Sequence, residues 1–159
     1  MAVKIQSTEI QNLQQMEVVV AGPEDANQLV IIDGQIDHQL VTHGAANAWA
    51  IVKETFSVLV GPTFTRKQFV RANATASLRR TQVVSVNAAD QAPPGASWSI
   101  NAVDADWDDE SGQVELRIEA QVTSKGAGQE VAISGIGFHV TILAAIATPS
   151  PAFTVPRFV

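Results

Sequence analysis

Apolar and polar residues alternate most regularly in the C-terminal half of the chain. Residues 114–123 carry an apolar side chain at every second position, and the positions between them are charged or polar. This period of two is typical of a strand with one buried and one solvated face. Residues 97–107 alternate in the same way, but their apolar phase slips by one near Ala102 and Val103, which predicts a β-bulge.

A third alternating stretch follows the glycine turn at residues 125–128. Within residues 131–142 the apolar phase changes once, where Gly135 and Gly137 lie. Glycine inside a strand is typical of such irregularities. Three successive strands joined by short polar turns predict a C-terminal three-stranded antiparallel meander.

The middle of the chain predicts further strands and little helix. Residues 48–60 alternate as a strand and end at a Gly-Pro pair, and residues 70–78 alternate before a run of β-branched residues. Residues 29–36 predict a hairpin that turns over Asp33 and Gly34. About eight strands at hairpin spacing favour an all-β fold, either an antiparallel β-sandwich or a jelly-roll-like fold.

The two ends of the chain differ from this pattern. Ile10, Leu13 and Met16 are spaced for one or two helical turns near the N-terminus. Residues 148–159 hold three prolines among apolar residues, which predicts an extended terminal arm. We therefore expect a single β-sandwich domain with an N-terminal segment over residues 1–147, followed by a Pro-rich apolar arm.

One acidic stretch, DADWDDESGQVE, has a spacing that resembles a calcium-binding loop. The helix–loop–helix calcium motif is excluded, because its sixth position requires glycine and is Asp109 here, and because the flanks alternate as strands. The residues DDESG predict a hairpin turn instead. The alternative is a calcium ion held in a β-loop by four carboxylates, which are Asp104, Asp106, Asp108 and Glu110.

The aromatic residues suggest one further binding chemistry. Trp107 borders the acidic turn and is expected to be exposed, where it would stack on a sugar, whereas Trp98 shares its phase with Ile100 and is expected in the core. A calcium-assisted carbohydrate-binding module is therefore the first alternative function, although the chain has no tyrosine. His38 and His43 are expected to be ordinary polar residues near a turn.

No nucleophile elbow, phosphate loop or histidine metalloprotease motif is present in the sequence. A hydrolase that uses two carboxylates is the second alternative, and an enzyme is not the favoured class. The chain also has no cysteine, which excludes thiolate catalysis and disulfides. Calcium is the one cofactor that the sequence suggests.

Charge is scarce and unevenly distributed. Charged residues make up 16% of the chain, against about 25% in typical globular proteins. Residues 66–80 contain five of the ten basic side chains, and residues 104–119 contain seven of the sixteen acids. We expect the basic strand to pair with the acidic hairpin, either within a subunit or across an interface that includes Arg79 and Arg80.

The net charge of −6 disfavours nucleic acid as a partner. No apolar run is long enough for a membrane span or a signal peptide, so we expect a soluble protein that is cytoplasmic at synthesis or part of a virion or similar assembly. Interface cores are depleted in charge, which favours a homo-oligomer.

The favoured function is a non-enzymatic structural or interaction subunit of such an oligomer, for example a component of a phage or bacterial assembly. In the arm, Phe153, Val155 and Phe158 are apolar and are expected to contact a neighbouring copy.

Overall fold

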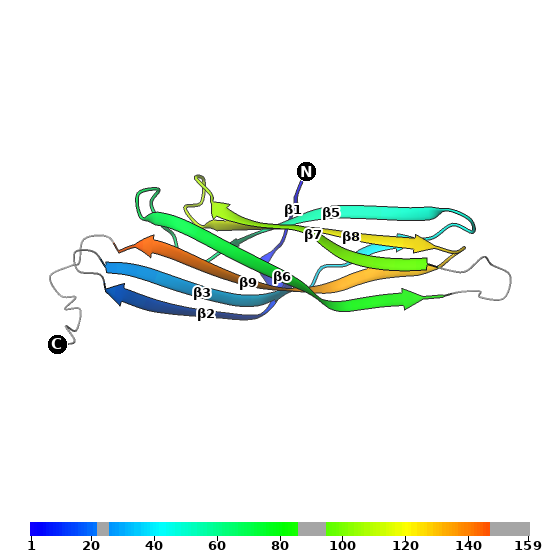
Figure 1. Cartoon of the computed structure of the whole chain (residues 1–159), viewed down its shortest axis with the longest axis horizontal. Coiled ribbons are helices and arrows are strands. Elements are labelled where there is room, and N and C mark those ends of the chain that lie inside the picture. The colour runs from blue at the N-terminus through cyan, green and yellow to red at the C-terminus, as the bar shows by residue number, and fades with distance from the viewer. Residues whose placement is uncertain (22–25, 86–94, 147–159) are drawn as a thin grey trace.

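Two β-sheets packed face to face form the described part of the protein (Figure 1). The computed structural model describes residues 1–21, 26–85 and 95–146. The four-stranded sheet has the order β1 (Val3–Lys4), β5 (Trp49–Val60), β8 (Val114–Lys125) and β7 (Gly95–Trp107). The five-stranded sheet contains β2 (Ile10–Ala21), β3 (Ala26–Ile36), β9 (Glu130–Ala145), β4 (Leu40–His43) and β6 (Phe69–Val84). The predicted all-β sandwich is confirmed.

Strand β9 organises the five-stranded sheet. On one side it pairs with β6 along nearly its whole length, and on the other side it pairs first with β4 and then with β3. The change from β4 to β3 falls between Ile133 and Ile136, where the pairing with β6 also shifts register. Gly135 lies at this irregularity, so the phase change predicted there is confirmed.

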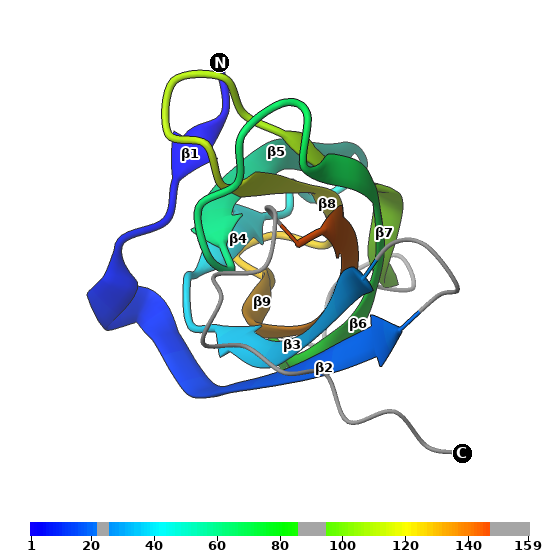
Figure 2. The same cartoon turned by 90° about the vertical axis from the view of Figure 1, so that its left-hand side faces the viewer.

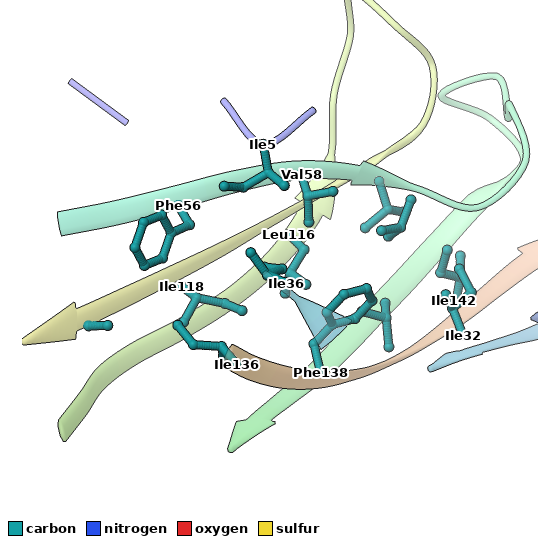
Figure 3. Packing of buried hydrophobic residues seen from close by; sticks show 14 of the residues in the cluster. Ile5, Ile32, Ile36, Phe56, Val58, Leu116, Ile118, Ile136, Phe138 and Ile142 are labelled. Carbon is teal, nitrogen blue, oxygen red and sulfur yellow. The ribbon is translucent and has the colours of Figure 1, made fainter. Parts of the chain in front are cut away.

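The core lies between the two sheets and consists of the inward-facing residues of both. In β8 the alternating residues from Val114 to Val122 are all fully buried, as the period of two predicts. Large side chains from β3, β5, β8 and β9 meet between the layers (Figure 3). Fully burying one such Leu, Ile or Phe contributes about 1.5–3 kcal/mol.

The predicted C-terminal meander is wrong in its last strand. Strands β7 and β8 pair as an antiparallel hairpin, and the register shift between Ile100 and Ala102 confirms the predicted bulge. Strand β9, however, pairs with β3, β4 and β6 and not with β8. Both edges of β8 are occupied, one by β7 and the other by β5. The turn after Lys125 therefore carries the chain across to the other sheet.

The predicted hairpin over Asp33 and Gly34 is also wrong, because β3 runs through both residues. Gly34 lies opposite Phe138 of β9, and a Cβ atom built on Gly34 would come within 2.5 Å of the Phe138 ring. This glycine therefore permits a close approach between strands instead of forming a turn.

The predicted helical turns near the N-terminus are replaced by one 3₁₀ turn, Ser7–Glu9, and by strand β2. Pairing with β3 satisfies the backbone of β2 and overrides the helical spacing. A bulge between Gln11 and Gln14 interrupts this pairing, and Asn12 adopts a positive φ of 53° there. No helix within the described ranges is long and apolar enough to span a membrane.

Candidate functional site

The acidic stretch forms a tight hairpin turn between β7 and β8, as predicted. The N–H of Asp108 donates to the Gln113 carbonyl, and the N–H of Gly112 donates back to the Asp108 carbonyl. Gly112 has a φ of 73°, in the left-handed region that favours glycine. The Asp108 carboxylate accepts hydrogen bonds from the hydroxyl and the N–H of Ser111, and these bonds lower the pKa of its carboxyl.

The four predicted calcium ligands are spread over two adjoining hollows. Asp104, Asp106 and Asp108 line a hollow of about 210 Å³ together with Arg117. Glu110 lines the other hollow, of about 310 Å³ beside β1, and Asp108 borders both. Among the described residues, no three His, Asp or Glu side chains are arranged to hold a metal ion. Calcium binding stays a prediction that this geometry does not support.

Trp107 is half-buried and holds the hairpin turn against the loop after β5. Its indole Nε1–H donates to the carbonyl of Phe64 at 3.0 Å and to the carbonyl of Gly112 at 3.2 Å. The guanidinium of Arg66 lies 5.6 Å from the centre of the ring. A sugar would have to displace Arg66 to stack on this face, so the predicted role of Trp107 in carbohydrate binding gains no support from the contacts.

Trp98 faces the core, which confirms its prediction, and its Nε1–H donates to the Ala132 carbonyl at 2.9 Å across the sheets.

The two arginines predicted at an interface do not reach the acidic hairpin of their own subunit. Arg80 pairs with Asp37 at 2.6 Å. Arg79 lies over Gly137, so that a Cβ atom built on Gly137 would come within 2.5 Å of the Arg79 Nε. The predicted pairing within a subunit is therefore wrong for Arg80. The pairing across subunits stays a prediction. The other predicted interface residues, Phe153, Val155 and Phe158, lie outside the described residues.

Each of the three histidines lies beside a carboxylate on a neighbouring element. These pairs are His38–Glu9 at 2.6 Å, His43–Glu130 at 3.2 Å and His139–Asp33 at 2.7 Å. The His38 bond and the N–H of Gln6 lower the pKa of the Glu9 carboxyl and fix the 3₁₀ turn beside β3. They are contacts between elements and not a cluster.

Carboxylate-based hydrolysis needs one carboxyl group that is protonated at the working pH. Three carboxylates line the larger hollow, Asp108, Glu110 and Glu115. Hydrogen bonds from Arg117 and from Ser57 lower the pKa of Glu115, and the Ser111 bonds lower that of Asp108. These contacts favour the ionised form of both Asp108 and Glu115, whereas the acid in such a reaction needs a raised pKa.

The surface that the sequence did not indicate is strand β2. It lies at the edge of the five-stranded sheet, outside β3 (Figure 2), and among the described residues it pairs only with β3. Every residue from Gln11 to Val20 is exposed, including those on the same face as the buried Val30 of β3. From Gln11 to Val20, strand β2 therefore extends beyond the sandwich, and neither of its faces is covered within the described structure.

Apolar side chains gather on the outward face of β2 and its neighbours. Met16 and Val18 are 56% and 40% exposed. They lie opposite Ile31 and Leu29 of β3, and Leu29 lies opposite Leu143 of β9. We call these five residues, with Val20, the β2 patch. A contiguous apolar surface of this kind is typical of a protein interaction site.

Comparison of the chain with protein-family models, curated proteins and solved structures finds no match in any of the three. The assignment of a function therefore depends on the geometry of the chain itself. The feature that distinguishes this chain from a sandwich with a fully polar exterior is the β2 patch on an open sheet edge.

Proposed function

We propose that this protein is a non-enzymatic structural subunit that associates with copies of itself through strand β2. The observation that carries the proposal is that β2 is an edge strand exposed on both faces with apolar side chains on each. Soluble proteins usually protect such an edge with Lys, Pro or a very short strand. Residues 10–21 contain no Lys, Arg or Pro, and their one charged residue is Glu17.

The scarcity of charge in the whole chain supports the same proposal, because surfaces that are buried between subunits are depleted in charged residues. Burying the apolar side chains of the β2 patch against a partner stabilises the complex by about 25 cal/mol per Å² of apolar surface removed from water. A second copy supplies an apolar face and unpaired backbone groups. These match the apolar face and the open edge of β2, which have no partner among the described residues.

The test is the mass of the protein in solution. We expect the wild-type chain to sediment as an oligomer at micromolar concentration. Val18→Lys places a charge in the β2 patch and is expected to weaken self-association by about tenfold or more, since an edge lysine opposes strand pairing.

The matched control is Ile51→Lys, which changes a β-branched residue on the outer face of β5 that is 61% exposed. This variant is expected to keep the wild-type mass. A wild-type protein that sediments as a monomer, or a Val18→Lys protein that keeps the full mass, contradicts the proposal.

A further inference from the structure

The outer edge of β2 carries backbone N–H and C=O groups that have no strand partner among the described residues. Beyond the bulge, residues 14–21 pair with β3 in unbroken register, so this part of the edge is regular and ready to accept another strand. Its residue sequence, QQMEVVVA, is rich in β-branched residues and contains one charge.

Symmetry limits how a second copy of β2 can pair with this edge. Two identical antiparallel strands in one sheet are related by a twofold axis perpendicular to the sheet, and directly opposite residues share a face. The residue on the axis therefore faces its own copy. In β2 the outward face holds Gln14, Met16, Val18 and Val20, because Met16 and Val18 lie opposite the outward Ile31 and Leu29.

Two positions of the axis give the longest overlap of residues 14–21, one at Glu17 and one at Val18. An axis at Glu17 places two carboxylates directly opposite each other, which destabilises a strand pair. An axis at Val18 places Glu17 opposite Val19 of the second copy. It also places Met16 opposite Val20, which joins the two β2 patches into one apolar surface.

We infer that β2 pairs antiparallel with β2 of a second copy, with Val18 on the twofold axis, so that the two five-stranded sheets form one continuous sheet. This inference rests on the proposed function and names the partner and the register of the same surface. The opposite edge of the same sheet is formed by β6, whose three arginines, Arg71, Arg79 and Arg80, disfavour pairing with a second copy.

The chain has no cysteine, so single cysteines report the register directly. In the inferred dimer the two residues at position 18 have Cβ atoms about 4.5–5.5 Å apart, close to the separation that a disulfide spans. The two residues at position 16 are four residues apart along the strands, or about 13 Å. Mild oxidation of Val18→Cys is therefore expected to give about tenfold more covalent dimer than oxidation of Met16→Cys.

A mixture adds an independent check. Met16→Cys and Val20→Cys are each expected to stay uncrosslinked alone and to form a covalent heterodimer when the two proteins are mixed, because position 16 faces position 20 of the second copy. Ile51→Cys on the other sheet is the control for random collision and is expected to give only background dimer.

The outcomes separate this inference from the proposed function. An oligomeric wild type with no crosslink at Val18→Cys and none in the mixture overturns the register and leaves self-association in place. A monomeric wild type overturns both. If the Val18→Cys dimer forms only in a chain that ends at Ile146, the protein's own C-terminal residues cover the edge, and pairing with a second copy is overturned.

Discussion

At the scale of single residues, Glu115 shows how a charged side chain is held on the outer face of the four-stranded sheet. It lies 2.6 Å from the Arg117 guanidinium and accepts a hydrogen bond from the Ser57 hydroxyl. Both contacts favour the ionised form, so the pKa of Glu115 in the folded protein lies below its ordinary value of 4.5.

The sign of the resulting pH dependence follows from this direction. A carboxyl with a lowered folded pKa adds stability above its unfolded pKa, and this contribution is lost as the pH falls through the folded pKa. We expect the free energy of unfolding to decrease between about pH 5 and pH 3. In Glu115→Gln part of this decrease should disappear, as measured by urea unfolding at both pH values. An equal decrease in the variant and the wild type would contradict this role of Glu115.

The alternation of residues predicted which aromatic side chains enter the core, but not which polar contacts the others make. Trp98 follows the apolar phase of its strand, and it packs against the core as expected. Trp107 lies at the end of that strand, and its partners Arg66 and Phe64 come from a loop far away in the sequence. Pairing of Arg80 with Asp37 depends in the same way on the sheet register, which local spacing does not contain.

At the scale of elements, Gly34 allows the ring of Phe138 on β9 to lie directly against the backbone of β3. Gly34→Ala places a methyl group against the ring of Phe138, which lies within 2.5 Å of the Cβ position. We expect this change to destabilise the protein by about 1–3 kcal/mol, as overpacking does. The measurement is the midpoint of urea unfolding.

A second substitution distinguishes overpacking from a loss of backbone freedom. Phe138→Leu removes the ring atoms that the new methyl group meets, so Gly34→Ala should cost less in that background than in the wild type. Equal costs in the two backgrounds would show that contact with Phe138 is not the cause.

Periodicity predicted where the strands lie better than it predicted which strands pair with one another. The ranges of β5, β6, β7 and β8 follow the alternation closely, because each of these strands has one face on the core. Strand β2 has no buried face between Gln11 and Val20, so no alternation was imposed on it and its residues resembled a helix. The crossing of β9 to the other sheet depends on which strand edges are still unpaired, and the sequence of one strand does not contain this information.

At the scale of the whole molecule, the C-terminal residues are predicted to contribute to assembly and not to the sandwich. The described residues up to Ile146 already form two packed sheets around a continuous buried core. We therefore expect a chain that ends at Ala147 to keep its β-sheet circular dichroism.

If Phe153, Val155 and Phe158 join copies as predicted, the same truncated chain should lose oligomer mass in analytical ultracentrifugation, down to the dimer inferred for β2. A truncated protein that keeps the full oligomer would show that these residues do not join copies. A truncated protein that unfolds would show that they belong to the core of their own subunit.

The position of β9 in the chain also has a consequence for biosynthesis. Strands β3, β4 and β6 all pair with β9, which the ribosome makes after the other eight strands that the structure describes. Until residues 130–145 emerge, these three strands have no central partner, and their apolar faces stay open to other nascent chains. Folding then waits for contacts between distant parts of the sequence, which is slow in all-β proteins, typically about milliseconds to seconds. The nascent chain therefore depends on a late-formed strand to hide the surfaces that its earlier strands expose.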